Sequence, residues 1–401
     1  MAIIKNMLAP HDAWGPEMVL AVSDPESGLQ GVLVIDNTAL GPGKGGIRMM
    51  PDVTEEEVRR LARTMTWKNA LAGIPFGGAK AGIRFSTDEG VEKKKLYLTR
   101  FAQALKPFLP KRYIAGPDVN TGEHDMKTFV DAAGNWRAAT GKPANVCMAA
   151  FGTKGGRPRR SRVNPGSRGK CGIPHEFGST GFGVAEATRV AAEFAGIPLK
   201  GARVAVDGFG NVGSFTCRYL HEMGALIVAV ADRDGATFSE NGIAPKDLEA
   251  LRNAGKSIRQ YQGGKALSRE AFFTTQSDIL IPASVTDIIH HGNKKNIKTR
   301  IIVEGANIPM RENVEEELFR RNILIVPDFV ANAGGVISSY AEYRGYNPKR
   351  MFSLVRDRIT TSVKAVLKES GRTGTNPRTV ALRIAEKRVA HAMKKRRLTF
   401  S

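Results

Sequence analysis

Apolar side chains recur at helical spacing in residues 54–73. The repeating positions are Val58, Leu61 and Met65. Thr54 and Glu57 have the spacing of a capping box, which predicts that a helix begins at this point. Lys68 falls on the same apolar stripe. A lysine on such a stripe either extends its ammonium past its neighbours to solvent, which is the commoner case, or lines a pocket.

The pattern changes in residues 202–232 to an apolar run, a glycine-rich turn, a helical stretch and a second apolar run. Further short apolar runs that end in polar or small residues occupy residues 278–283, 300–307 and 323–328. Such runs predict buried parallel strands whose carboxyl ends carry function. Beyond residue 335 the helical spacing returns.

The glycine-rich turn has the spacing GxGxxG. It consists of Gly208, Phe209, Gly210, Asn211, Val212 and Gly213. In such a turn the first glycine permits a tight bend, the second lets the backbone approach a pyrophosphate, and the third lets the helix pack on the strand. The amino end of the helix then faces the anion with unpaired N–H groups. We therefore predict that these residues bind a dinucleotide.

The end of the second strand bears on which dinucleotide binds. Asp232 would accept hydrogen bonds from the adenosine ribose, which favours NAD. Arg233 follows it directly and would bind a 2′-phosphate, which favours NADP. The expected cofactor is therefore NAD or NADP, and the sequence leaves the choice open.

These patterns predict an α/β fold with two domains. We expect a substrate-binding α/β domain in residues 1–184 and a Rossmann-type dinucleotide-binding domain in residues 185–335. A helical C-terminal tail, residues 336–401, is expected to pack back on the first domain.

The composition is that of a globular protein, with 42% hydrophobic and 25% charged residues among 401. No apolar stretch is long enough to span a membrane and no secretory signal is evident, so we expect a cytoplasmic protein. Cys147, Cys171 and Cys217 lie far apart and form neither a CxxC pair nor an even set. This spacing fits a reducing interior without disulfides.

The charge is unusual, because 60 Lys and Arg against 39 Asp and Glu give a net charge of +21. Such an excess is typical of a protein with an anionic partner or of one in a polyanion-rich cytoplasm. Part of it lies in residues 152–170, which have the composition of a basic, glycine-rich loop. Nucleic-acid binding is therefore an alternative function. It leaves GxGxxG unexplained, and the chain lacks basic stretches interleaved with aromatic residues.

Three lysines stand in glycine-rich or apolar surroundings: Lys44 in GPGKGGIR, Lys68 in MTWKNA and Lys80 in FGGAKAG. Two such lysines can hold the carboxylates of a small substrate, and like charge with burial would lower the pKa of a third. Asp118, in AGPDVNTGE, would carry protons if it lies within reach. We expect the glycines that surround Lys80 to clear space for the substrate. These are Gly77, Gly78 and Gly82.

These segments resemble the Glu/Leu/Phe/Val dehydrogenase family. The similarity runs in order from about residue 38 to the end and includes IPFGGAKAGI, GPDVNTGE, GSTGFGVAEAT, DGFGNVG, EGANIP and PDFVANAGGVISSYAEY. GGAK and NAGGV are specific to the family. The resemblance implies a homohexameric NAD(P)-dependent amino-acid dehydrogenase, in which the first domain also mediates oligomerisation.

Within the family the chain is most similar to members that act on glutamate. The implied reaction converts L-glutamate, water and NAD(P)⁺ to 2-oxoglutarate, ammonium and NAD(P)H, and the reverse. The resemblance makes Lys80 the catalytic lysine and Asp118 the proton relay. It assigns the α-carboxylate to Lys68 beside Met65, and the side-chain carboxylate to Lys44 helped by Ser339. The implied dinucleotide contacts are Thr180 and Asn211 and, at the nicotinamide end, Asn307 and Asn332. No metal is implied.

An apolar amino acid, such as leucine, valine or phenylalanine, is the alternative substrate on the same fold. Members of that kind carry an apolar residue where Lys44 stands, because a buried ammonium without its carboxylate is costly. The chain departs from the family at several positions, among them the following two. The family's usual arginine is replaced by Glu176, and residues 152–170 do not resemble the family.

Overall fold

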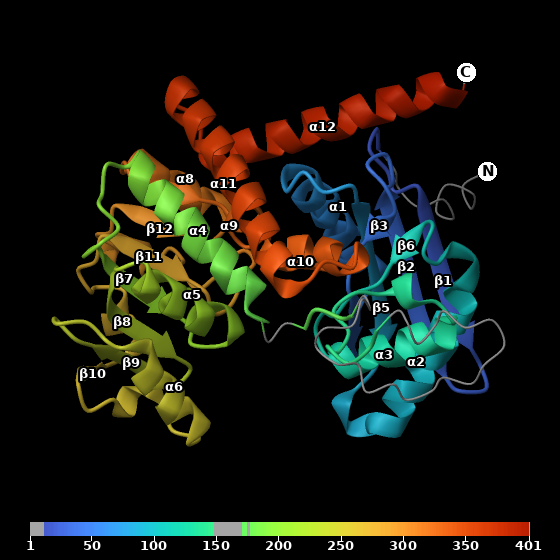
Figure 1. Cartoon of the computed structure of the whole chain (residues 1–401), viewed down its shortest axis with the longest axis horizontal. Coiled ribbons are helices and arrows are strands. Elements are labelled where there is room, and N and C mark those ends of the chain that lie inside the picture. The colour runs from blue at the N-terminus through green and yellow to red at the C-terminus, as the bar shows by residue number, and fades with distance from the viewer. Residues whose placement is uncertain (1–11, 148–170, 175–176, 401) are drawn as a thin grey trace. The chain divides into compact units, whose positions relative to one another are not determined.

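The computed structural model describes residues 12–147, 171–174 and 177–400, with side chains up to residue 396. The expectations that concern Glu176 and residues 152–170 lie outside the described residues. The chain forms two compact units, each of which is described by itself (Figure 1).

Unit 1 consists of residues 1–174, 338–351 and 385–401, and unit 2 of residues 175–337 and 352–384. The first boundary thus follows residue 174, whereas the sequence pattern placed it after residue 184. The expected C-terminal tail is shared between the two units.

Unit 1 is built on a six-stranded sheet. Its strands are β1 (Met18–Asp24), β2 (Leu29–Asn37), β3 (Gly43–Lys44), β4 (Ile47–Met50), β5 (Gly77–Arg84) and β6 (Tyr113–Ile114). Their order is β1-β2-β5-β3-β6, and β4 also pairs with β5. β1 and β5 run antiparallel to β2, whereas β3 and β4 run parallel to β5 and β6 runs parallel to β3.

Three helices pack on this sheet (Figure 1). α1 (Glu55–Leu71) packs on β2 and β5, and α2 (Val91–Leu105) and α3 (Glu123–Ala133) contribute to the main apolar core. Successive side chains of β5 point to opposite faces of the sheet, one toward α1 and the other toward α2 and α3. Ala79 and Ala81 lie in the core with α2 and α3. Lys80 and Gly82 therefore face α1, and a Cβ atom on Gly82 would meet Val58 of that helix.

α1 begins where the capping box predicts, because the Thr54 side chain accepts a hydrogen bond from the N–H of Glu57. Its buried face differs from the apolar stripe of the sequence. The face is made by Val58, Ala62, Thr66 and Asn69, whereas Leu61, Met65 and Lys68 are half-buried. Small and polar residues form this face because the helix lies very close to β5.

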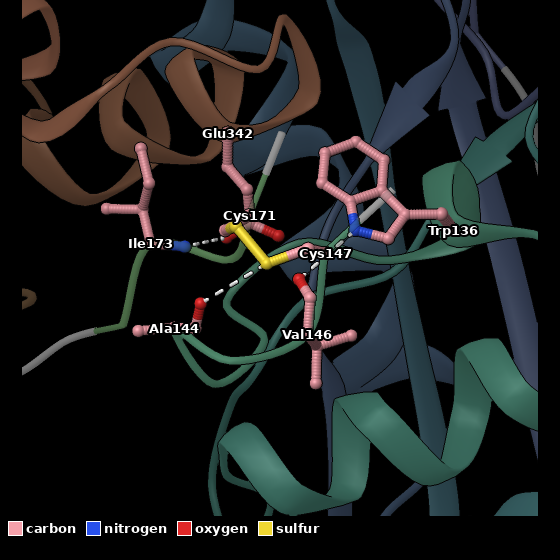
Figure 2. The surroundings of a disulfide bond; sticks show 7 residues. All are labelled: Trp136, Ala144, Val146, Cys147, Cys171, Ile173 and Glu342. Atoms are coloured by element: carbon pink, nitrogen blue, oxygen red, sulfur yellow. Dashed lines mark hydrogen bonds between the residues drawn. A yellow bond between two sulfur atoms is a disulfide. The ribbon is translucent and has the colours of Figure 1, made fainter. Parts of the chain in front are cut away.

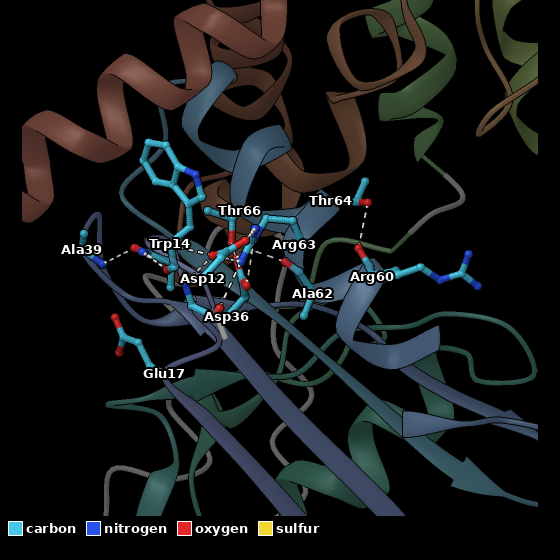
Figure 3. A network of polar contacts seen from close by, with 12 residues as sticks. Asp12, Trp14, Glu17, Asp36, Ala39, Arg60, Ala62, Arg63, Thr64 and Thr66 are labelled. Carbon is cyan, nitrogen blue, oxygen red and sulfur yellow. Dashed lines mark hydrogen bonds and ion pairs between the residues drawn. The ribbon is translucent and has the colours of Figure 1, made fainter. Parts of the chain in front are cut away.

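A polar network anchors α1 to β2 (Figure 3). Arg63 Nε donates to both carboxylate oxygens of Asp36 at 2.9 Å, and its terminal nitrogens donate to Asp12. Thr66, on the next turn of α1, also donates to Asp36. Burial raises the pKa of Asp36 in spite of these donors. The network fixes the helix on the strand that pairs with β5.

Unit 2 is built on a seven-stranded sheet. Its strands are β7 (Arg203–Asp207), β8 (Leu226–Asp232), β9 (Gly235–Phe238), β10 (Lys265–Leu267), β11 (Ile279–Pro282), β12 (Ile301–Val303) and β13 (Leu324–Val326). The order is β10-β9-β8-β7-β11-β12-β13. Strands β8, β7, β11, β12 and β13 are parallel, and β9 is antiparallel to both of its neighbours. This sheet confirms the predicted Rossmann-type fold.

The helices of unit 2 alternate with these strands along the chain and pack against the sheet (Figure 1). α4 (Ser179–Phe194) and α5 (Asn211–Glu222) pack together, and α7 (Arg269–Phe272) and α8 (Glu312–Arg320) bury Phe272, Val314 and Leu318 in an apolar core. α6 (Pro245–Asn253) and α9 (Asp328–Ala331) also lie in unit 2, whereas α10 (Gly334–Tyr343), α11 (Pro348–Thr373) and α12 (Pro377–Phe400) each have residues in both units. No helix in the described ranges is long and apolar enough to cross a membrane.

The expectation that the cysteines form no disulfide is wrong. Cys147 and Cys171 are joined by a disulfide bond, and Cys217 is a buried free thiol (Figure 2). The backbones on either side are paired, because the N–H of Gly172 donates to the carbonyl of Val146 at 3.0 Å. The two cysteines are 24 positions apart and meet because their short segments pair in the folded chain. Rules based on local cysteine spacing do not detect such a pair.

Candidate active site

The two residues expected to carry catalysis are in direct contact within unit 1. Lys80 Nζ, from β5, lies 2.9 Å from Asp118 Oδ2, in the loop after β6. Arg48, from β4, lies 3.0 Å from the same oxygen. Burial acts to raise the pKa of Asp118, but Lys80 and Arg48 together bring it below its ordinary value. Asp118 is therefore a carboxylate held between two cations.

The loop that carries Asp118 is fixed in place. Thr121 Oγ1 accepts from the backbone N–H of Asp118 at 2.8 Å and donates to the carbonyl of Ile47 at 2.7 Å. Gly46 permits this close packing, because a Cβ atom there would lie 2.6 Å from the carbonyl oxygen of Pro117. These contacts hold the Asp118 carboxylate in a fixed position beside Lys80.

Lys44 lies in β3, the strand beside β5, and is only 3% exposed. Its ammonium donates to the carbonyl of Ala115 at 2.9 Å. Burial lowers the pKa of Lys44 to about 7; Glu342 opposes the shift, and Lys142 and Lys80 add to it. Among the residues that the structure describes, Lys44 has no carboxylate partner, so its ammonium is available to an anionic group of a substrate.

The three glycines around Lys80 do not clear space for a substrate, and that expectation is wrong. A Cβ atom on Gly77 would lie 1.9 Å from a carbonyl oxygen of β2, and one on Gly78 would lie 2.1 Å from Thr66 of α1. A Cβ atom on Gly82 would lie 2.7 Å from a core valine. These glycines instead let other parts of the protein pack directly against β5.

The remaining predicted substrate residues lie on helices of unit 1. Met65 and Lys68 are half-buried on α1, one turn apart, and α1 packs on the strand that carries Lys80. Ser339 is half-buried on α10, in the part of that helix that belongs to unit 1. The structure thus brings Lys80, Asp118 and Lys44 together and places the other three on neighbouring helices.

In unit 2 the GxGxxG turn joins β7 to α5. Gly208 has a φ of +104°. A Cβ atom on Gly213 would lie 1.8 Å from the carbonyl oxygen of Gly208, whereas one on Gly210 would meet nothing within 4 Å. The amino end of α5 carries no side-chain cap. The turn therefore fits a pyrophosphate, with open space at the amino end of α5. Phe209, Asn211 and Val212 complete it.

Comparison with known proteins agrees with the features of each unit. The model of the Glutamate/Leucine/Phenylalanine/Valine dehydrogenase family matches residues 171–397, and that of the dimerisation domain of Glu/Leu/Phe/Val dehydrogenases matches residues 16–135. The chain belongs to this dehydrogenase family. The resemblance found in the sequence is thereby confirmed.

Individual members of the family are similar over most of their length. The NADP-specific glutamate dehydrogenase of Saccharolobus shibatae is 39% identical over 90% of this chain and 84% of that protein. The NAD-specific glutamate dehydrogenase of Peptoniphilus asaccharolyticus is 34% identical over 82% and 77%. A crystal structure of hetero-hexameric glutamate dehydrogenase from Thermus thermophilus, in a leucine-bound form, gives a TM-score of 0.78 at 26% identity, covering 95% of this chain and 90% of that one.

In this dehydrogenase Asn332 and Asn307 are hydrogen-bonded to each other at 3.1 Å. A buried ion cluster holds the segments that carry them. Arg378 lies 2.7 Å from Glu304 and 3.0 Å from Asp328, and the N–H of Asp328 donates to Glu304 at 2.7 Å. Burial raises the pKa of Glu304. The two asparagines are thus supported by a fixed framework.

Thr180 lies in the first turn of α4. A Cβ atom on Gly335 would lie 3.0 Å from its hydroxyl oxygen, so Thr180 faces the amino end of α10. Gly334 meets the preceding residue even more closely, because a Cβ atom there would lie 2.1 Å from the carbonyl oxygen of Ser179. The NAGGV glycines of the dehydrogenase therefore allow two helix ends to meet beside Thr180.

The acidic residue at the end of β8 is already engaged. Asp232 Oδ2 accepts from Ser257 Oγ at 3.0 Å and from the N–H of Ile258 at 2.9 Å. Its Oδ1 accepts from the N–H of Asp234 at 2.8 Å and from Ser257 at 3.3 Å. The Arg233 side chain is 92% exposed, with its Nε 3.7 Å from Asp234.

The sequence patterns did not point to four further residues of unit 1. These are Arg48, Thr140, Lys142 and Glu342. The Thr140 hydroxyl is buried without a hydrogen-bond partner, and Lys142 and Glu342 form a buried ion pair. An available signal was Glu342 in SSYAEY, the one charged residue of α10, three residues after Ser339. Among the described residues no His, Cys, Asp or Glu group could hold a metal ion.

Proposed function

We propose that this chain converts L-glutamate, water and NAD(P)⁺ to 2-oxoglutarate, ammonium and NAD(P)H, and catalyses the reverse reaction. The observation that carries the proposal is the Lys80–Asp118 pair beside Lys44, a buried ammonium without a carboxylate partner among the described residues. When bound, the dinucleotide supplies the hydride acceptor or donor. The chain supplies the proton chemistry and holds both ends of the substrate.

Lys80 and Asp118 carry the proton transfers. As an amine, Lys80 takes a proton from the water that attacks the α-carbon, and as an ammonium it polarises the oxygen there. Asp118 lies within hydrogen-bond distance of Lys80 and moves protons to and from the amino group of the substrate. Lys80 and Arg48 keep Asp118 ionised, which is the form that accepts a proton.

Lys68, beside Met65, binds the α-carboxylate in this proposal, and Lys44, helped by Ser339, binds the side-chain carboxylate. An apolar substrate would leave the Lys44 ammonium buried without an anion, which costs free energy. Glutamate and 2-oxoglutarate supply that anion. They are therefore preferred over leucine, valine and phenylalanine and their 2-oxo acids.

An absorbance assay of the reduced dinucleotide tests the proposal. Turnover is measured with 2-oxoglutarate and with 2-oxoisocaproate, each with ammonium and with NADH or NADPH. We expect turnover mainly of 2-oxoglutarate. Preferred turnover of 2-oxoisocaproate would favour the apolar alternative, and no turnover with any pair would refute the enzyme assignment.

We also propose that the chain prefers NADP(H) to NAD(H). Asp232 already accepts from three donors, the Ser257 hydroxyl and the N–H groups of Asp234 and Ile258, so the carboxylate has little capacity left for the ribose hydroxyls. Arg233 is exposed beside it, and Lys256 and Arg259 flank Ser257, the main partner of the carboxylate. This is a cationic setting suited to a 2′-phosphate.

Calorimetric titration with adenosine 2′,5′-bisphosphate and with AMP tests the cofactor preference without turnover. Tighter binding of the bisphosphate, lost in Arg233→Ala and kept in the surface control Arg218→Ala, is the expected result. Equal affinities for the two nucleotides would contradict the preference and leave the proposed reaction untouched.

Two broader properties complete the proposal. The family resemblance supports a homohexamer, and a hetero-hexameric structural neighbour supports the number of six subunits. Light scattering coupled to gel filtration would measure it. The need for a pyridine dinucleotide supports a cytoplasmic location. In a reducing cytoplasm Cys147 and Cys171 would be thiols, so differential alkylation of protein taken directly from cells tests the location.

A further inference from the structure

Glu342, on α10, is fully buried and accepts three hydrogen bonds within unit 1. One carboxylate oxygen accepts from the N–H of Gly141 at 2.9 Å and from the N–H of Ile173 at 2.8 Å. The other accepts from the ammonium of Lys142. Figure 2 shows Glu342 beside the Cys147–Cys171 disulfide, with Ile173 donating to it. The carboxylate therefore ties α10 to two separate loop segments.

Lys142 has no exposed surface and is as constrained as its partner. Its ammonium donates to Glu342 and to the carbonyl of Ala139, and it lies 4.2 Å from the centroid of the Trp136 ring. Burial lowers the pKa of Lys142, and Glu342 opposes that shift. An isolated buried ammonium is unfavourable, so Lys142 depends on the carboxylate.

Three buried lysines stand among the described residues of unit 1, and they differ in their charge partners. Lys80 is paired with Asp118, and Lys142 is paired with Glu342. Lys44 donates only to a carbonyl among its described contacts. The charged groups that act on Lys44 are Glu342 from α10, Lys142 from the loop after Ala139, and Lys80 from β5. Glu342 is the one anion of this set, and it is already ion-paired with Lys142.

We propose that Glu342 is a positioning residue for the site that binds the substrate's side-chain carboxylate: it balances Lys142 and holds the adjoining loops while leaving Lys44 as the ammonium that the substrate must pair. Lys142 in turn keeps Glu342 away from Lys44. Without Lys142 the carboxylate would be free to pair with Lys44 in place of the substrate. The inference rests on the proposed function, because it requires a substrate with a second carboxylate.

The consequences of removing each charge differ. In Glu342→Gln, Lys44 faces two ammonium groups and no anion, so it loses its proton at a lower pH. In Lys142→Met, Glu342 is unbalanced and pairs with Lys44, which keeps its proton to a higher pH but is blocked. Both single variants weaken binding of a dicarboxylate. The double variant replaces the pair by two neutral side chains of similar volume, a change that buried ion pairs often tolerate.

The test measures KM and kcat across pH for 2-oxoglutarate and for 2-oxopentanoate, which lacks the distal carboxylate. Calorimetric titration of glutarate gives binding without turnover. For Glu342→Gln we expect KM for 2-oxoglutarate to rise about tenfold, the effect of roughly one pKa unit on Lys44. The rise should begin at lower pH than in the wild type, with little change for 2-oxopentanoate. The double variant should recover most of the loss.

A merely structural role predicts a different result. If Glu342→Gln lowered kcat for both substrates equally and left the pH dependence unchanged, the inference would be wrong. It would be equally wrong if the double variant, shown to be folded by its thermal transition, bound glutarate no better than either single variant. Failure of the proposed function is distinguishable, because the wild type would then neither turn over 2-oxoglutarate nor bind glutarate.

Discussion

The ammonium of Lys44 lies directly over Gly116: a Cβ atom on that glycine would be 2.4 Å from Nζ. In Gly116→Ala the added methyl group meets the end of a flexible side chain, so the lysine moves and the backbone keeps its place. We expect little loss of stability, but a rise in KM for 2-oxoglutarate of about tenfold, as expected for loss of one hydrogen bond to a charged group. Steady-state kinetics with 2-oxopentanoate provide the control, since that substrate has no carboxylate to place. A large fall in melting temperature would contradict this prediction.

Substrate affinity should depend on pH through Lys44. Its pKa is lowered to about 7, so the ammonium predominates below that pH and is lost above it. KM for 2-oxoglutarate should therefore rise above pH 7, at most tenfold per pH unit, whereas KM for 2-oxopentanoate should not follow it. Lys44→Met should abolish the difference. The same KM profile for both substrates would show that the titrating group is not Lys44.

Stability should respond to the same group with a definite sign. The pKa of Lys44 is about 7 in the folded chain and 10.5 when the side chain is exposed, so between these values the unfolded chain binds more protons. The free energy of unfolding should therefore increase as pH rises from about 7 toward 10, by a few kcal/mol at most. Denaturant unfolding of the wild type and of Lys44→Met measures the difference. A contribution from Lys44 that falls over this range would contradict the assignment.

Lys80→Ala should abolish turnover and leave dinucleotide binding largely intact, because Lys80 and Asp118 lie in unit 1 and the GxGxxG turn lies in unit 2. Loss of a catalytic proton-transfer group typically costs about 10²–10⁴ in rate. Lys93→Ala is a matched control, since Lys93 is an exposed lysine that pairs with Glu89 and lies over the ring of Tyr97, outside the candidate site. Fluorescence titration with the reduced dinucleotide measures binding. Loss of both properties together would make Lys80 a structural residue.

Gly78→Ala should destabilise unit 1, because its methyl group would lie 2.3 Å from a backbone nitrogen of α1, which cannot yield as a side chain does. Overpacking of this kind costs about 1–3 kcal/mol. Gly122→Ala is the control, since no atom lies within 4 Å of its Cβ position. Denaturant unfolding compares the two. Equal stability of both variants would mean that α1 moves away from β5 at no cost.

Local patterns anticipated the local features of this chain. Thr54 caps α1 as its spacing with Glu57 predicts, because a capping box needs only neighbouring residues. The strand, turn and helix around Gly208, Gly210 and Gly213 were predictable for the same reason. The resemblance to the family supplied Lys80 and Asp118 as a pair before any contact between them was visible.

The sequence by itself determined that this chain has a dinucleotide turn, a capped helix and a set of lysines suited to carboxylates. Each of these features depends on residues that are close together in the sequence. Tertiary structure decided which charges are paired. Lys142 and Glu342 meet although 200 positions separate them, and Cys147 meets Cys171. It also decided that Gly78 serves helix packing. Burial and long-range pairing depend on how β5, α1 and α10 pack together, and no local period in the sequence records that arrangement.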